Sequence, residues 1–263
     1  MNFELNNLVI GYQGYKVAGP MTDNLHAGEL CCLLGANGAG KSTLLRTLAA
    51  FQPPLEGEIR IDGRNISEIP PRQLSTLIGI VLTERIKMGG ITVRDMVAMG
   101  RSPYTNFWGR LTDEDNHEVD QAMQQVGITQ FANRQISTLS DGERQKVMIA
   151  KALAQGTPII LLDEPTAFLD FPSKVEVMLL LGRLAHEMGK SIFLSTHDLD
   201  LALQTADRLW LMAPSGCKMS NVECGIAVGT PRELANELPD FFPSQHLSFD
   251  KTSLRFNIVN CAL

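Results

Sequence analysis

The sequence predicts an α/β protein in which a mixed, largely parallel sheet is flanked by helices, with an inserted helical segment and a small antiparallel part. Short apolar runs alternate with longer segments of helical periodicity, which is typical of parallel strands joined by crossover helices. A length of 263 residues suits one such unit with an insertion. Apolar residues make up 44% of the chain, so it has enough of them for a sizeable core and is not disordered as a whole.

Strands and helices are expected at defined places along the chain. Uninterrupted apolar runs predict buried strands at residues 30–34, 77–82, 159–162, 192–195 and 209–212. Helical periodicity predicts helices at residues 42–50 and 174–188. In the second of these helices we expect one buried face that carries, on it or near it, Val175, Met178, Leu179 and Leu181.

The chain is expected to form one core with two additions. Strand patterns stop after about Glu84, and helical patterns follow at residues 92–100, 113–126 and 140–154. We therefore expect a core of residues 1–84 and 155–238, a helical insertion of residues 85–154, and a C-terminal extension of residues 239–263. A short helix is expected after Pro231. Packing of the extension on its own chain, rather than a regulatory contact, is favoured by Phe241, Phe242, Phe249 and Phe256.

Charge and cysteine content exclude several classes of protein. The formal net charge is -6 and no block of Lys and Arg occurs, which argues against nucleic acid as a partner. The N-terminus lacks the features of a secretory signal, and no apolar run reaches the roughly 18 residues of a membrane span. We therefore expect a soluble, cytosolic chain. The cysteines lack CxxC spacing, so we expect Cys31 and Cys32 to be small core side chains.

A glycine-rich segment follows the strand predicted at residues 30–34. Residues 35–43 read GANGAGKST, which fits the pattern GxxxxGK[ST] between a strand and a helix. Its glycines allow a tight turn whose N–H groups point at phosphate oxygens, and the helix adds its positive dipole end. Lys41 supplies a charge for the β- and γ-phosphates, and the Ser42 hydroxyl supplies a Mg²⁺ ligand. The alternative is a glycine-rich connection with a chance lysine. The predicted nucleotide-binding residues are Gly35, Asn37, Gly38, Ala39, Gly40, Lys41, Ser42 and Thr43.

Two carboxylates end the strand predicted at residues 159–162. At the carboxyl end of a parallel strand, both side chains can turn toward a ligand crevice. Asp163 is predicted to be a second Mg²⁺ contact, and Glu164 to be the general base for an attacking water. The alternative is a strand that simply ends at two polar residues.

Residues 139–143 read LSDGE and open a predicted helix shortly before that strand. Ser140 followed by Glu143 fits a capping box, so an ordinary capped helix is one interpretation. The position of this segment between two nucleotide motifs also resembles the LSGGQ signature of the ABC ATPases. The resemblance covers most of the chain, from about Asn2 to Pro239, because several motifs occur in the order typical of that family.

This resemblance implies that the chain binds ATP with Mg²⁺ and works as a head-to-tail homodimer. In the family, the signature helix of one cassette contacts the ATP bound to the other, so Ser140 and Gly142 would act in trans. Asp170, in the segment LD after Pro165, resembles the residue at the dimer seam.

Two further roles follow from the same resemblance. Tyr12 resembles the aromatic residue that stacks on adenine, with Tyr15 as a near competitor. His197, in the segment STHD, resembles the histidine that contacts the γ-phosphate. The catalytic set is then Glu164, His197 and Lys41.

The chain departs from the family pattern at three positions. Glu84 is the best candidate for the place of a Gln that normally reaches Mg²⁺ and the attacking water. A carboxylate can still bind Mg²⁺, but an ionised one cannot donate a hydrogen bond. Asp141 and Glu143 replace the usual Gly and Gln of the signature and add negative charge near the triphosphate. We expect these differences to affect hydrolysis rate and coupling rather than nucleotide binding.

Residues 91–104 and 109–115 resemble the helical segment of importers for iron-siderophore, haem and cobalamin. The resemblance implies two cassettes beneath a two-copy transmembrane permease, which docks in a groove around residues 84–101, and a substrate-binding protein that acts indirectly. The chain would then lie at the cytoplasmic face of the bacterial inner membrane. The alternatives are a helical hairpin without a partner, a non-transport ABC ATPase, and a nucleotide-gated scaffold with negligible hydrolysis.

Overall fold

The computed structural model describes residues 1–82, 90–106, 108–213, 225–242 and 246–259. Its centre is a six-stranded sheet in the order β10-β9-β3-β8-β7-β6, which is parallel except for the edge pair β10–β9. All the predicted strands are present, and the predicted α/β class is confirmed. The strands are β3 (Leu30–Gly35), β6 (Ile78–Val81), β7 (Ile159–Leu162), β8 (Ser191–Ser195), β9 (Arg208–Met212) and β10 (Ile226–Gly229).

The two faces of this sheet lie in two different cores. In β3, Leu30, Cys32 and Leu34 belong to the core beneath the helices, whereas Cys31 and Leu33 belong to the other one. Successive side chains of a strand point to opposite faces, so a strand buried on both faces needs an apolar residue at every position. This requirement explains the uninterrupted run LCCLL in the sequence.

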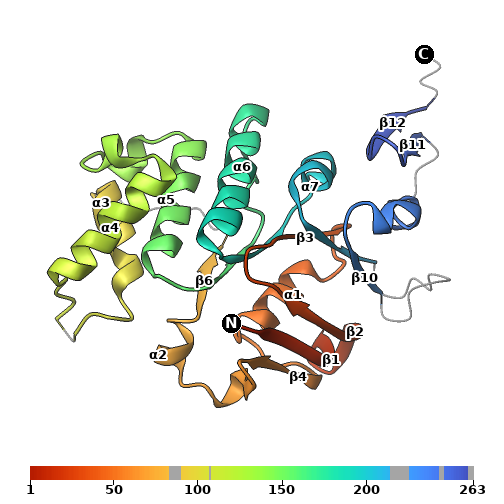
Figure 1. Cartoon of the computed structure of the whole chain (residues 1–263), viewed down its shortest axis with the longest axis horizontal. Coiled ribbons are helices and arrows are strands. Elements are labelled where there is room, and N and C mark those ends of the chain that lie inside the picture. Colours follow the sequence, from red (N-terminus) through yellow and green to blue (C-terminus); the bar gives the residue numbers. More distant parts are fainter. Residues whose placement is uncertain (83–89, 107, 214–224, 243–245, 260–263) are drawn as a thin grey trace.

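A four-stranded antiparallel sheet and helix α1 (Lys41–Leu48) cover one face of the central sheet. Figure 1 shows α1 and this smaller sheet on the same side of the central strands. The small antiparallel part expected from the sequence is this sheet. In the order β2-β1-β4-β5, its strands are β1 (Phe3–Tyr12), β2 (Tyr15–Leu25), β4 (Glu56–Ile61) and β5 (Arg64–Asn65). Short helical turns follow β5, namely η1 (Ile66–Glu68) and α2 (Pro71–Leu74).

Helices cover the opposite face and the β6 edge. Helices α6 (Phe171–Met188) and α7 (Leu199–Thr205) pack against β3, and the helices between residues 93 and 154 form a group beside β6 (Figure 1). No helix within the described ranges is long and apolar enough to cross a membrane. The group beside β6 consists of α3 (Val93–Ala98), η2 (Met99–Arg101), α4 (Asp113–Val126) and α5 (Asp141–Ala154), with η3 (Thr129–Phe131) and η4 (Ile136–Thr138) between the last two.

The orientation of α6 corrects one expectation from the sequence. Val177, Met178 and Leu181 face the core and are at most 1% exposed, whereas Leu179 is 61% exposed. A helix turns about 100° per residue, which places residue 179 roughly opposite the line of residues 177, 181 and 184. Leu179 therefore does not belong to the buried stripe.

The C-terminal residues pack against their own chain, as expected. Phe241 is 3% exposed, and Phe242, Phe249 and Phe256 are partly buried against the core beneath the helices. The ring centroids of Phe249 and Phe256 are 4.7 Å apart. The short helix expected after Pro231 is also present. The helices and strands of this C-terminal part are η5 (Glu233–Asn236), α8 (Leu238–Phe241), β11 (Leu247–Asp250) and β12 (Arg255–Ile258).

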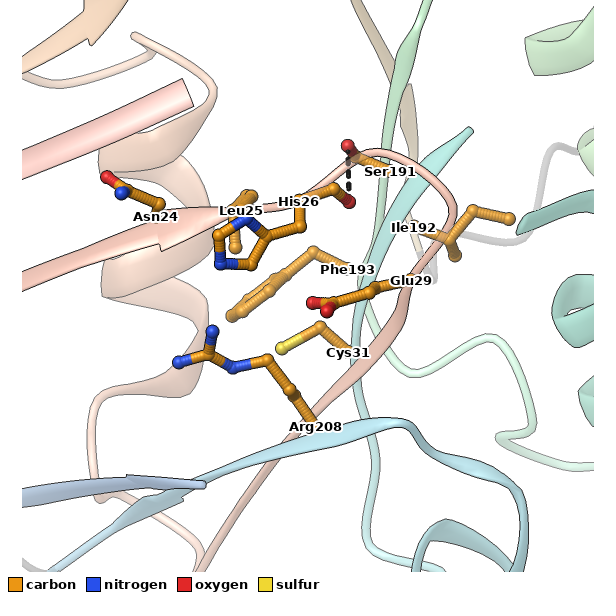
Figure 2. Close-up of a pocket in the computed structure, with 9 residues that line it drawn as sticks. All are labelled: Asn24, Leu25, His26, Glu29, Cys31, Ser191, Ile192, Phe193 and Arg208. Carbon is orange, nitrogen blue, oxygen red and sulfur yellow. Dashed lines mark hydrogen bonds between the residues drawn. The ribbon is translucent and has the colours of Figure 1, made fainter. Parts of the chain in front are cut away.

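Cys31 and Cys32 are small core side chains, as predicted. Both are buried, and burial raises the pKa of each thiol. Figure 2 shows Cys31 in a small pocket that Phe193 and Arg208 also line. The cavity volume is about 10 Å³, room for no more than one water molecule. A protonated, enclosed thiol is unreactive, so this pocket is part of the packing. The other cysteines, Cys217, Cys224 and Cys261, lie outside the described residues.

Candidate functional site

Residues 35–43 run from the last residue of β3, through a loop, into the first turn of α1. Gly38 and Gly40 have φ angles of 79° and 105°, which L-residues with a side chain rarely adopt. Gly35 is needed for another reason, since a Cβ there would lie 2.6 Å from the carbonyl oxygen of Met212 in β9. Ala39 is buried at 1% exposure, whereas Asn37 and Gly38 are exposed at the tip. The loop thus turns tightly and keeps an open backbone surface.

Lys41 is the first residue of α1 and is 6% exposed. Its ammonium donates to the carbonyl oxygens of Gly35 at 2.9 Å and Ala36 at 3.2 Å, so the charge lies within the loop. Burial lowers the pKa of Lys41, while Glu164 and Asp163 act in the opposite direction. The first turn of α1 contains no acidic residue. Together with the positive end of the helix dipole, these features favour an anion at the loop.

Ser42 and Asp163 meet across the carboxyl ends of β3 and β7. The Ser42 hydroxyl donates to Asp163 Oδ2 at 3.5 Å. Adjacent oxygen ligands of an octahedral Mg²⁺ lie roughly 3 Å apart, so a small closure would let both atoms bind one ion. No cluster of three or more His, Cys, Asp or Glu side chains in the described ranges forms a metal cage. Glu84 lies outside the described residues.

Glu164 points toward His197 at the same edge of the sheet. The φ angle of Glu164 is 47°, and this left-handed residue supplies the turn of the backbone expected after β7. Its Oε1 lies 2.5 Å from Nε2 of His197, and the two side chains are 31% and 43% exposed. A partly exposed carboxylate beside an imidazole is suited to accept a proton from water.

A buried hydroxyl contacts both Asp163 and Glu164. Ser195 is 0% exposed, and its Oγ donates to Asp163 Oδ1 at 2.7 Å. The same oxygen accepts a hydrogen bond from the backbone N–H of Glu164 at 2.9 Å. The sequence pattern assigned no role to Ser195. The signal that could have found it is a polar residue directly after the apolar run of residues 192–194.

A second set of polar side chains links the segment after Glu164 to the segment that contains His197. Asp198 accepts a hydrogen bond from the Thr166 hydroxyl at 2.6 Å and pairs with Lys174 Nζ at 2.7 Å. Thr166 is 2% exposed, so its hydroxyl needs this partner. The segments on either side of the Glu164–His197 pair are thereby fixed to one another.

The N-terminus of α5 is a capping box, as the sequence predicts. The backbone N–H of Glu143 donates to Ser140 Oγ at 3.2 Å, and the N–H of Ser140 donates to the Glu143 carboxylate at 2.8 Å. This second bond holds the pKa of Glu143 below its ordinary value. Arg144 pairs with Asp141 at 2.8 Å, and Arg134 lies 3.6 Å from Glu143. The two acidic residues that depart from the family pattern are therefore partly compensated by neighbouring arginines.

Gly142 and Asp170 both lie close to Ser173 in the first turn of α6. A Cβ on Gly142 would lie 2.9 Å from Ser173 Oγ, so a side chain there would force the Ser173 side chain to move. Asp170 caps α6 by accepting a hydrogen bond from the N–H of Ser173 at 3.3 Å. Within the described part of the chain, no hydrogen bond or ion pair joins Ser140 or Gly142 to the loop of residues 35–43.

Tyr12 and Tyr15 flank the turn between β1 and β2 and are 63% and 79% exposed. The same hairpin reaches the loop of residues 35–43, because a Cβ on Gly40 would lie 2.2 Å from Cγ1 of Val17. Both tyrosines are therefore carried by a hairpin that contacts the loop, and the choice between them as the stacking residue stays open.

The sequence of the chain is similar to those of known transport proteins. The family described as ABC transporter matches residues 19–167. An uncharacterized ABC transporter ATP-binding protein of Methanocaldococcus jannaschii is 41% identical over 239 residues, which cover 89% of this chain and 80% of that protein. The ferric enterobactin transport ATP-binding protein of Escherichia coli is 37% identical over 227 residues, which cover 86% and 81% of the two chains.

Solved structures show the same similarity. A metal-chelate type ABC transporter in an inward-facing conformation aligns with a TM-score of 0.79 at 27% identity, over 98% of this chain and 97% of that chain. A dimeric ATP-binding cassette in a post-hydrolysis state, bound to ADP and phosphate, aligns with a TM-score of 0.65 at 28% identity, over 79% and 92% of the two chains.

Proposed function

The chain belongs to the ABC transporter family, and we propose that it is the ATP-binding and ATP-hydrolysing subunit of an import system for iron-siderophore, haem or cobalamin. The observation that carries this proposal is the convergence of Lys41, Asp163 and the Glu164–His197 pair on one edge of the sheet, beside the loop of residues 35–43. These groups lie shortly after the carboxyl ends of three strands, β3, β7 and β8, that are neighbours in the central sheet.

Each group has a task in the hydrolysis of ATP. The loop N–H groups and Lys41 bind the phosphates, and Ser42 and Asp163 would hold Mg²⁺, which would supply positive charge to the phosphate oxygens. Glu164 accepts a proton from the attacking water, and His197 orients Glu164 and contacts the γ-phosphate side of the site. Tyr12 supports the adenine, and Glu84 is the candidate third contact to Mg²⁺.

Two copies of the chain complete the site. Ser140 and Gly142 lie at the exposed N-terminus of α5, a position suited to bind an anion on a second molecule. In a head-to-tail homodimer these residues contact the ATP of the partner, and Asp170 lies at the seam. The dimeric form of a similar cassette supports this arrangement.

We take a groove of about 850 Å³ as the docking site of the permease. Of the residues 84–101 expected to surround that site, Met99 and Gly100 line this groove, whereas residues 84–89 lie outside the described residues. The groove lies where the core meets the helical insertion of residues 85–154, with an apolar lining from η1 and α2 on one side and η2 on the other. Lys151 of α5 supplies a charge at this groove. An amphipathic helix of a two-copy permease fits such a surface. The chain then lies at the cytoplasmic face of the bacterial inner membrane, and a substrate-binding protein delivers the chelate. Groove residues include Ile66, Ile69, Leu74, Met99 and Pro103.

Steady-state phosphate release from the purified chain tests the proposal. Glu164→Gln keeps the size of the side chain but removes the base, so turnover is expected to fall about 100- to 10,000-fold. ATP binding should persist and dimer should accumulate, whereas Lys41→Ala should lose ATP binding. Glu187→Gln, an exposed carboxylate on α6, is the matched control. Phosphate release by Glu164→Gln at the wild-type rate would refute the assignment of Glu164 as the general base. Undetectable hydrolysis by the wild type, alone and with its permease, would instead favour a nucleotide-gated scaffold.

A further inference from the structure

Ser195 is the last residue of β8 and lies at the carboxyl edge of the sheet beside β7. Leu194 pairs with Leu162, so the next residue on each strand, Ser195 and Asp163, meet at the end of the paired strands. Ser195 is 0% exposed. A buried hydroxyl is costly unless it is hydrogen-bonded, which makes the partners of this one informative.

The hydrogen-bonding roles of this hydroxyl are determined by its two partners. The ionised Asp163 carboxylate only accepts, and the backbone N–H of Glu164 only donates. The single hydroxyl proton therefore goes to Asp163 Oδ1, at 2.7 Å, and an oxygen lone pair receives the Glu164 N–H, at 2.9 Å. One side chain thereby holds two successive residues whose proposed tasks differ.

The bond to Asp163 selects which carboxylate oxygen faces the ATP site. Oδ1 is held by Ser195, and Oδ2 is the oxygen directed at the Ser42 hydroxyl, 3.5 Å away. Partners behind a metal-binding carboxylate orient it in this way, and losing one commonly weakens metal affinity about 10- to 100-fold.

The bond to Glu164 holds a backbone conformation that costs free energy. A residue other than glycine at φ 47° is strained, and such residues persist only where their surroundings hold them. The Glu164 N–H bonds to Ser195, and the Glu164 carbonyl oxygen accepts from the N–H of Ala167 at 3.0 Å. These two bonds keep the side chain turned toward His197.

We propose that Ser195 is a positioning residue that aligns the Mg²⁺-binding Asp163 with the water-activating Glu164 through one buried hydroxyl. The inference rests on the proposed function, since it gives Asp163 and Glu164 their roles. Ser195 touches neither ATP nor water in this scheme and acts only through its two neighbours. Loss of the hydroxyl frees the Asp163 carboxylate to rotate and relaxes the Glu164 backbone, so it affects metal binding and turnover together.

Ser191 offers a matched control at the other end of the same strand. It is also buried, at 7% exposure, and its Oγ donates to the carbonyl oxygen of His26 at 2.8 Å, as Figure 2 shows. Ser191→Ala and Ser195→Ala each delete one buried hydroxyl from β8, which leaves the His26 carbonyl oxygen unsatisfied in the first variant and the Asp163 carboxylate and the Glu164 N–H in the second. A purely structural role for Ser195 therefore predicts that both variants lose stability without a change in metal binding.

The test titrates Mg²⁺ into the purified full chain bound to adenylyl imidodiphosphate, a non-hydrolysable ATP analogue, with binding followed by calorimetry. For Ser195→Ala we expect Mg²⁺ affinity to fall about 10- to 100-fold and kcat to fall with it. Analogue binding in EDTA should be unchanged. Ser191→Ala should keep wild-type Mg²⁺ affinity, and Ser195→Thr, which retains the hydroxyl, should recover most of it.

The outcomes separate this inference from the proposed function. Equal Mg²⁺ affinity in Ser195→Ala, Ser191→Ala and wild type would overturn the positioning role, even if turnover changed. If Ser195→Ala does not fold, Mg²⁺ affinity in Ser195→Thr decides, because a loss there as large as 10-fold would also overturn it. A wild-type chain whose analogue binding does not respond to Mg²⁺ would contradict the proposed function itself.

Discussion

Replacing Arg101 by Met should destabilise the helices beside β6 by about 4 kcal/mol. Arg101 in η2 forms an ion pair with Asp115 of α4, with 2.9 Å between Nε and Oδ1, and the two side chains are only 8% and 5% exposed. Its Nη1 donates to the carbonyl oxygen of Ala154 at 2.9 Å, and the guanidinium lies 4.0 Å from the ring centroid of Tyr104. One side chain thus joins η2, α4 and the end of α5.

The magnitude follows from the burial of the pair. Removing one partner of a buried ion pair leaves the other charge uncompensated and typically costs about 3 to 5 kcal/mol. The bond to Ala154 belongs to the same side chain, so its roughly 1.5 to 3 kcal/mol overlaps with that figure. Since a domain is stable by about 5 to 15 kcal/mol in total, the loss should lower the urea midpoint markedly.

Equilibrium unfolding in urea of Arg101→Met, Asp115→Asn and the double variant measures this prediction. Asp115→Asn keeps an oxygen for the N–H of Thr112 but removes the charge. The double variant should therefore lose about 2 to 3 kcal/mol less unfolding free energy than the two single variants lose together. A loss below about 1 kcal/mol in Arg101→Met, or strict additivity, would refute the claim that the pair acts as a unit.

Two other outcomes follow from the signature helix. Gly142→Ala should cost about 1 to 3 kcal/mol, because the new Cβ would lie 2.9 Å from Ser173 Oγ, and Ser173→Ala should restore part of the loss. Urea unfolding of both variants checks this, and no recovery would count against the contact. Glu143 has a pKa lowered by its bond from the Ser140 N–H, so its contribution is present above its ordinary pKa and lost as the pH falls through the folded value. Wild-type stability should therefore decline more steeply below about pH 4.5 than that of Glu143→Gln. Parallel pH profiles of the two proteins would contradict this.

Contiguous patterns of the sequence were sufficient to predict five strands of the central sheet, its main helices and the motifs they carry, but not β10 or the individual strands of the four-stranded sheet. The run LCCLL, the glycines of residues 35–43 and the capping box at Ser140 each depend on neighbours in the chain. Backbone sterics and hydrogen bonding act over a few residues, so such features are legible without a structure. The orientation of Leu179 was predicted wrongly, because small shifts in helix rotation relative to the sheet decide which neighbour is covered.

Which side chains meet was decided by the tertiary structure alone. Glu164 reaches His197, and Ser195 reaches Asp163, only because β8 lies between β3 and β7 in the sheet. A side chain at position 142 would be crowded only because α6 brings Ser173 close to Gly142. The order of the strands and the docking of the helices depend on the total apolar surface buried in the two cores. Every element contributes a part of that surface, so no local sequence pattern determines it. The sequence by itself therefore identified the parts of an ATP site, and the packing of the two cores placed them within reach of one another.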